Sequence, residues 1–309
     1  MLKLNPKLDD SDLFLRLFHK GIKAQWSVED VTWDDPLQFD PQQARSLARL
    51  LSPVYLGEQS AMLGASVALP QMAMAGQTSA QLYLSSFLMD EARHFEVLTR
   101  LYTRLDSEPL QIRELPAMLR YHHRLRQGDR IDWVWGILIS DIFAKNFYQQ
   151  FGRSQPEALF GKLSLRILQD ESRHQAFAEN YLKQMMPSLS SDRVQVLKQM
   201  KDELMEIMDA MYSHLNDDAK RLGLDGRVFL DDLRAEIEYK SKRIGLDSNL
   251  SDDGDGGGAV RRVFQGISDN VIQKASDLTT KFSALLPSRC DTCFVALLCQ
   301  SRLLRTACS

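Results

Sequence analysis

Two short motifs in this chain repeat the same side chains in the same order. Asp90-Glu91-Ala92-Arg93-His94 and Asp170-Glu171-Ser172-Arg173-His174 each place a glutamate three residues before a histidine. On an α-helix this spacing brings both side chains onto one face, one turn apart. Because the whole chain has only six histidines, the repeat indicates a built site and not two chance pairs.

Two further acids, outside the motifs, are candidates for the same site. Glu58 and Asp141 are each the only acid on an otherwise apolar helical face. A carboxylate on such a face must be paired, protonated or bound to a metal, because a bare buried charge is costly. For Asp141 the alternative is a surface ion pair with Lys145, one turn further on.

The four positions divide into two similar halves. Glu58 precedes Glu91 by 33 residues, Asp141 precedes Glu171 by 30, and the two motifs are 80 residues apart. Each half therefore predicts a helical hairpin that supplies one carboxylate, then a carboxylate with a histidine. Two facing hairpins gather four carboxylates and two imidazoles at one centre. This mostly hard, oxygen-rich set suits iron or manganese better than tetrahedral zinc. The predicted ligands are Glu58, Glu91, His94, Asp141, Glu171 and His174, and Glu58, Glu91 and Glu171 are also the predicted catalytic residues.

The first acid of each motif has a separate expected role. A histidine that binds metal usually donates its other N–H to a carboxylate. We predict a crossed arrangement, in which Asp90 orients His174 and Asp170 orients His94. The alternative is that these acids only pair with Arg93 and Arg173.

Helical periodicity covers most of the chain, so the expected fold is all-α, a four-helix bundle with additional helices. An irregular arm at 25–36 follows a first helical segment. Trp26 and Trp33 either anchor this arm against the bundle or only pack on the surface, and surface packing is the prediction. A proline at the first helical position follows the expected cap Asp40, and this helix is expected to be interrupted near Pro53. The remaining helices are expected at about 79–102, 132–151, from 157 to about 186, 193–222 and 227–244.

Charge, composition and hydropathy limit the expected partners and indicate the domain organisation. A net charge of −3 does not favour nucleic acid, and no apolar run reaches the roughly 20 residues that span a bilayer. The start lacks the apolar core of a secretory signal, so a cytoplasmic location is expected. We divide the chain into a metal-binding bundle (1–245), a Gly/Asp-rich linker (246–259) and a C-terminal amphipathic segment with a cysteine tail (260–309).

The two Asp-Glu-x-Arg-His motifs resemble those of the ferritin-like di-iron carboxylate superfamily, over about residues 15–245. The similarity is greatest to relatives of the ribonucleotide reductase small subunit, notably the ligand-binding oxidases, and to bacterial monooxygenase hydroxylases. The resemblance implies the same six ligands, two iron ions or a manganese and an iron, and O₂ as a reactant. It also implies a small-molecule substrate and an electron donor.

Two positions depart from that family pattern. Asp141 stands where the oxidase branch usually has glutamate, and its shorter side chain would either change the metal spacing or open a coordination site. Leu98 stands where reductase subunits carry their radical tyrosine, which argues against a radical-storing subunit. Tyr55 stays open as either a redox-active or a structural residue.

The sequence leaves several functions open. The principal expectation is an O₂-dependent oxidase or oxygenase, in which Phe87, Leu88, Phe95 and Leu98 shield the centre. The alternatives are reduction of peroxide or O₂ without an organic substrate, iron storage, and a structural metal-binding role. The tail cysteines are a candidate electron entry or zinc site, and a homodimer is a further open alternative. The tail cysteines are Cys290, Cys293, Cys299 and Cys308.

Overall fold

The structure, a computed structural model, describes residues 8–247. Within this range the chain forms eight α-helices and no strand, which confirms the all-α prediction. None of these helices is long and apolar enough to cross a membrane. The helices are α1 (Leu13–Lys23), α2 (Pro41–Met74), α3 (Thr78–Arg104), α4 (Pro116–Arg126), α5 (Arg130–Ser154), α6 (Leu159–Met185), α7 (Ser191–Arg221) and α8 (Gly226–Ile244). The predicted linker beyond Asp247, the 260–286 segment and the cysteine tail lie outside the described residues.

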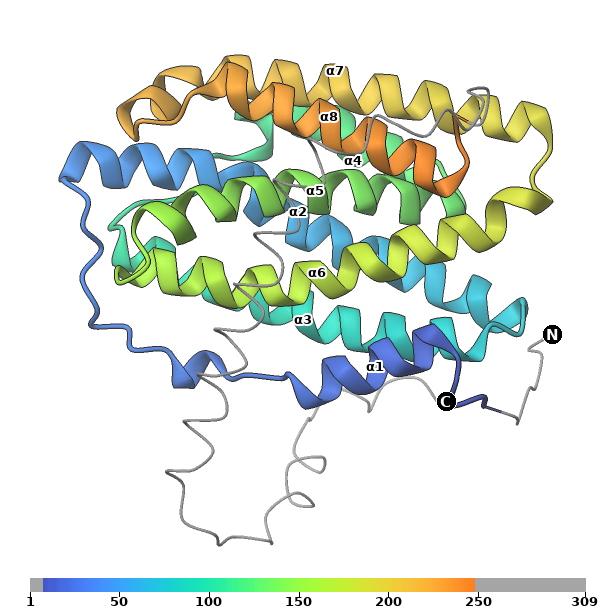
Figure 1. Ribbon diagram of the computed structural model, residues 1–309. Helices are drawn as coiled ribbons and strands as arrows, with labels where there is room; N and C mark the ends of the chain where they lie inside the picture. The colour runs from blue at the N-terminus through green and yellow to red at the C-terminus, as the bar shows by residue number, and fades with distance from the viewer. Residues whose placement is uncertain (1–7, 248–309) are drawn as a thin grey trace, which may run out of the picture. The chain divides into compact units, whose positions relative to one another are not determined.

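Two helical hairpins form the core, as the internal repeat predicts. α2 packs on α3 and α5 packs on α6, and the hairpins meet through contacts of α2 with α5 and of α3 with α6. Figure 1 shows α7 and α8 on one side of this four-helix core and α1 on the other. The inward faces of all four core helices are mostly apolar, and their buried charged residues include the predicted ligands and the aspartates and arginines of the two motifs.

Helix α2 begins as the sequence indicates but does not break where expected. The Asp40 side chain accepts hydrogen bonds from the first backbone N–H groups of the helix. The predicted interruption near Pro53 is wrong, because α2 runs unbroken through it. Proline removes one helical hydrogen bond, and a local hydroxyl cluster braces this turn. Ser52 Oγ and Tyr102 Oη both donate to the Ala48 carbonyl, at 3.0 and 2.9 Å.

The N-terminal arm packs across the core hairpins. α1 contacts α3 and α6, and the short helix η1 (Val28–Asp30) contacts α3. The N-cap Asp12 ties α1 to the start of α3, since its second carboxylate oxygen accepts from Ser79 Oγ at 2.9 Å. The residues that follow α1 therefore lie against the outer side of the two motifs.

Two glycines of α2 should respond in opposite ways to alanine. A Cβ on Gly64 would lie 1.3 Å from Nε1 of the buried Trp133 ring, whereas a Cβ on Gly57 would meet nothing within 4 Å. We expect Gly64→Ala to lower the free energy of unfolding by about 1–3 kcal/mol through overpacking. Gly57→Ala should raise it by about 0.5–1 kcal/mol, because alanine restricts the unfolded chain. Urea unfolding of both variants checks this, and equal effects would contradict the close α2–α5 approach.

Candidate metal centre

All six predicted ligands are buried inside the four-helix core. Their exposed fractions range from 0 to 6%. Each core helix contributes, so no local segment could build the site by itself. Glu58 comes from α2, Glu91 and His94 from α3, Asp141 from α5, and Glu171 and His174 from α6.

Five of the six form two overlapping clusters. Glu58, His94 and Glu171 offer ligand atoms that all lie within 4.8 Å of one another, and Glu91, Glu171 and His174 do the same. Glu171 belongs to both clusters. It places Oε1 3.6 Å from His94 Nδ1 and Oε2 3.6 Å from His174 Nδ1. One carboxylate thus faces both histidines, the geometry expected of a bridge between two ions.

The other two glutamates each face one histidine. Glu58 Oε2 lies 3.6 Å from His94 Nδ1, and Glu91 Oε1 lies 3.1 Å from His174 Nδ1. Both histidines therefore direct Nδ1 toward the carboxylates and Nε2 away from them.

Asp141 lies beside these clusters without belonging to either. It lines the same cavity as Glu58, Glu91 and Glu171, and its Oδ2 has no hydrogen-bond partner in the described part of the chain. Its backbone carbonyl accepts from Gln175 Nε2 at 3.1 Å, which fixes α5 against α6 at this level. Lys145, the alternative partner considered from sequence, makes an ion pair with Glu236 of α8.

The histidines are held from behind by acids of the opposite motif. His94 Nε2 lies 3.1 Å from Asp170 Oδ2, and His174 Nε2 lies 3.4 Å from Asp90 Oδ2. In the neutral tautomer that donates Nε2–H to an aspartate, Nδ1 has a lone pair that points into the centre. The contacts cross between the motifs, and their role in supporting bound metal stays a prediction.

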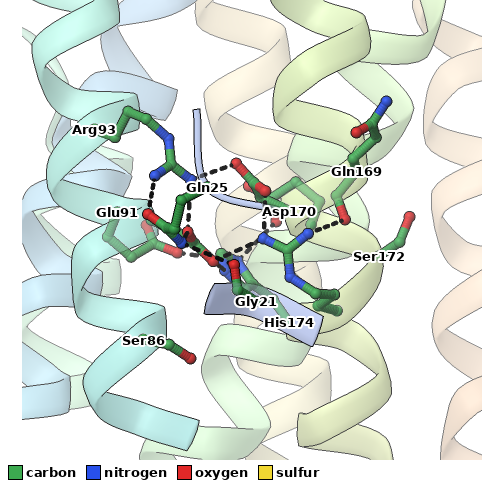
Figure 2. A network of polar contacts seen from close by, with 12 residues as sticks. Gly21, Gln25, Ser86, Glu91, Arg93, Gln169, Asp170, Ser172 and His174 are labelled. Carbon is green, nitrogen blue, oxygen red and sulfur yellow. Dashed lines mark hydrogen bonds and ion pairs between the residues drawn. The ribbon is translucent and has the colours of Figure 1, made fainter. Parts of the chain in front are cut away.

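Both arginines of the motifs also join this layer. Figure 2 shows Arg93, Asp170 and His174 in one polar network between α3 and α6. Arg93 Nη2 lies 2.5 Å from Asp90 Oδ1 and 2.8 Å from Asp170 Oδ2. Arg173 Nη2 likewise contacts both aspartates, at 3.0 Å for Asp90. The aspartates thus bind histidine and arginine at once, so the two readings considered from sequence are not exclusive.

This layer keeps both aspartates ionised. Burial by itself would raise the pKa of Asp170, but His94 and the two arginines hold that pKa well below its usual range. The pKa of Asp90 is likewise low, because His174 and Arg173 outweigh burial and the neighbouring Asp170. Each histidine therefore faces a full negative charge at Nε2.

The arm supplies two partners that the sequence did not reveal. Trp26 Nε1 donates to Asp170 Oδ2 at 2.9 Å, and Gln25 Nε2 donates to Asp90 Oδ1 at 2.9 Å. The Arg93 guanidinium also lies over the Trp26 ring, with Arg93 Cζ 4.7 Å from the ring centroid. Trp26 is thus part of the polar layer, which corrects the prediction that it only packs on the surface. The sequence did offer one signal for these contacts, because Gln25 and Trp26 are adjacent donors that directly follow the first helical segment.

The pKa values of four groups in the centre are raised, whereas His94 and Glu91 hold the pKa of Glu58 below its ordinary value despite its burial. Burial and the neighbouring Glu58 raise the pKa of Glu91 well above its ordinary value. Burial and the carboxylate of Glu171 raise the pKa of Asp141. Burial would lower the pKa of His94, but Asp170 and Glu58 raise it well above the usual histidine value, and that of His174 is also raised. Protons thus offset the crowded negative charge when no cation does.

We expect the metal-free protein to lose stability as the pH rises above neutrality. The pKa values of His94 and His174 are higher folded than unfolded. Their stabilisation is therefore complete below the unfolded pKa of about 6.5 and is lost as pH climbs through the folded pKa. Urea unfolding of chelator-treated protein at a series of pH values above about 6.5 measures how the free energy of unfolding depends on pH. Metal-loaded protein is the control and should lack the decline, and a flat metal-free curve would contradict the prediction.

The donor set fits metal ions on atoms that the protein leaves unused. His94 Nδ1, His174 Nδ1, Glu171 Oε2 and Asp141 Oδ2 are buried and have no hydrogen-bond partner among the described residues. Buried polar atoms in native proteins are normally satisfied. His94, His174 and Glu171 belong to the two clusters, and four of the six predicted ligands are carboxylates, which matches the preference of iron and manganese.

The apolar shield around the centre is smaller than the sequence predicted. Phe87 and Leu98 are buried, and the Phe87 ring lies 4.5 Å from the His174 ring. Leu88 and Phe95 are only partly buried. Phe95 stacks on Tyr55 instead, with ring centroids 4.5 Å apart. The Tyr55 hydroxyl bonds to Thr99 Oγ1 on the outer side of α2 and α3.

Comparison with known proteins adds the fold. No family model matches the chain, and neither does any curated protein sequence. Among solved structures, it is similar to an R2-like ligand-binding oxidase with aerobically reconstituted Mn/Fe cofactor. The TM-score is 0.65 at 17% identity, covering 77% of this chain and 95% of that one. An R2-like ligand-binding oxidase with aerobically reconstituted metal cofactor after photoconversion has a TM-score of 0.66 at 16% identity, covering 77% of this chain and 95% of that one. The chain has the fold of these oxidases. The expected resemblance is thereby confirmed at the level of the fold.

Proposed function

We propose that this chain binds two metal ions, iron with iron or manganese with iron, and uses O₂ to oxidise a small organic molecule. The observation that carries the proposal is the pair of buried clusters that share Glu171. The similar oxidase structures hold a Mn/Fe cofactor, which supports the choice of metals.

The ligands divide naturally between the two ions. Glu58 and His94 would hold one ion, and Glu91 and His174 the other, with Glu171 between them. Asp141 is proposed as the sixth ligand, from the cavity wall. The shorter aspartate side chain reaches less far than a glutamate, which accounts for its place outside the two clusters.

The bound ions would supply the electrons that reduce O₂. The residues of the chain perform the remaining tasks. Asp90 and Asp170 keep Nδ1 of each histidine free for a metal, and Glu91, with its raised pKa, can hold a proton beside the centre. Phe87 and Leu98 exclude water from the α3 side.

The proposed substrate site is a cavity lined by Glu58, Glu91, Asp141 and Glu171. Besides the acids, its lining is mostly apolar, with side chains from α2, α4, α5 and α7. The apolar members include Met118, Phe143, Met208 and Met211. Such a lining suits a small organic substrate with little charge. A separate electron donor would return the ions to their reduced state after each reaction.

Anaerobic loading with Fe(II), followed by exposure to O₂, tests the proposal. We expect about two irons per chain and a rapid change in the optical spectrum when O₂ is admitted. Binding of one metal or none would contradict the dinuclear site. Iron storage predicts many irons per chain, so the same count separates that alternative from an oxidase.

A further inference from the structure

Helix α4 is a basic element in an acidic protein. Residues 115–128 contain three arginines and two histidines and no Asp or Glu, although the whole chain has a net charge of −3. Arg124 pairs with an acid of α7 at 2.7 Å. Arg120 and Arg126 are exposed and make no ion pair within the described residues, and the same is true of Arg113, just before the helix. The fold therefore leaves positive charge uncompensated at this surface.

The exposed side chains of α4 gather on one face. Leu119, Arg120, His123 and Arg126 are all exposed, and their spacing of three to four residues places them on one side of the helix. We call this set the basic face of α4. Leu119 is 40% exposed, so an apolar side chain lies among the cationic ones. An apolar centre with a polar rim is typical of protein–protein interfaces.

The opposite face of the same helix lines the cavity of the metal centre. Met118 and Tyr121 of α4 are buried and belong to the same cavity wall as Glu58, Glu91 and Asp141. One helix thus separates the basic face from the candidate ligands, and a helix with its side chains is about 10–12 Å across. Because electron tunnelling slows steeply with distance, a redox partner must come this close to a buried centre.

We propose that the basic face of α4 docks an acidic one-electron carrier protein, of the iron–sulfur class, that re-reduces the metal centre. The inference rests on the proposed function, which requires a separate electron donor. In each docking event the cluster of the carrier is oxidised by one electron, and one metal ion of the centre is reduced by one. Two docking events therefore serve the two ions.

The charge distribution favours an acidic protein over other anionic partners. Because the chain is acidic overall, it repels such a protein elsewhere and attracts it at α4, which orients the encounter. Electron-transfer complexes use small interfaces, for which a few arginines suffice. Nucleic acid binding strengthens with each phosphate that is neutralised, and anionic membranes are recognised by clusters of about four to eight Lys or Arg residues. The basic face offers fewer.

Binding of a fluorescently labelled plant-type [2Fe–2S] ferredoxin, an acidic carrier, tests the docking surface directly. Fluorescence anisotropy with the full chain should show binding at low salt that weakens as ionic strength rises. The double variant Arg120→Glu/Arg126→Glu should lower the affinity about tenfold or more, because two attractive charges become repulsive. Circular dichroism establishes that the variant is folded.

The matched control is Arg227→Glu on α8, which reverses an exposed arginine that makes no ion pair in the described part of the chain. It should bind ferredoxin as the wild type does. A wild type that binds no ferredoxin, or equal weakening per charge by Arg227→Glu, overturns the proposal. Tighter binding of duplex DNA or anionic lipid vesicles through the same arginines overturns it too, because the partner would then be of another class.

Reduction of the oxidised, iron-loaded protein links docking to the centre. Reduced ferredoxin should reduce the wild type several times faster than the double variant, whereas dithionite, which needs no docking surface, should reduce both at the same rate. Equal rates with ferredoxin overturn the proposal. If the wild type holds no pair of irons, the proposed function itself fails at that step, and the anisotropy measurement still decides whether α4 is a docking surface.

Discussion

Glu171→Ala should abolish binding of both metal ions, and not only one of them. Glu171 is the carboxylate that belongs to both clusters and faces Nδ1 of both histidines. Elemental analysis after anaerobic Fe(II) loading should fall from about two irons per chain to well below one. The spectral change with O₂ should disappear with the metal.

The stability of the metal-free variant separates a ligand from a structural residue. Glu171 lies among other carboxylates and raises the pKa of Asp141, although it also faces both histidines. Its removal therefore has opposing effects on the metal-free protein, relief of repulsion and loss of a carboxylate beside the imidazoles. We expect metal-free Glu171→Ala to lose less stability than a variant that removes a fully ion-paired buried glutamate.

Glu179→Ala is the matched control for Glu171→Ala. Glu179 is also a buried glutamate of α6, but it pairs with Lys240 and Arg243 of α8. This variant should lose stability and still bind two metals. Full metal binding by Glu171→Ala, or its loss in folded Glu179→Ala, would contradict the assignment of the site.

Asp170→Ala should cause the largest loss of stability. Asp170 accepts from Trp26, contacts His94, and pairs with both Arg93 and Arg173. Its removal leaves buried guanidinium groups short of counter-charge, which typically costs about 3–5 kcal/mol. Urea unfolding of the metal-free protein measures this loss.

The same substitution should also weaken metal binding without removing a ligand. Loss of the group behind a ligating histidine typically lowers metal affinity about 10–100-fold, here through His94. Asp209→Ala, which removes the exposed partner of Arg234, is the control and should cost about 1 kcal/mol or less. If Asp170→Ala and Asp209→Ala lowered the free energy of unfolding and the metal affinity equally, the assigned role of Asp170 would be wrong.

The sequence by itself determined the all-α class, the two hairpins and the burial of the six candidate ligands. These properties follow from local rules. Three-residue spacing places Glu91 with His94, and Glu171 with His174, on one helical face, and apolar periodicity turns that face inward. The repeat then implies that the two halves meet, because neither hairpin can bury its apolar face alone.

Only the tertiary structure decided which atoms meet across the bundle. The links of Trp26 to Asp170 and of Gln25 to Asp90 join residues 144 and 65 positions apart, a separation that no local pattern encodes. At the turn before Pro53, Tyr102, from another helix, donates to the Ala48 carbonyl. Phe95 turns outward to Tyr55 because packing between α2 and α3 sets its direction. Helical spacing defines faces, whereas depth, register and partners depend on how the helices pack.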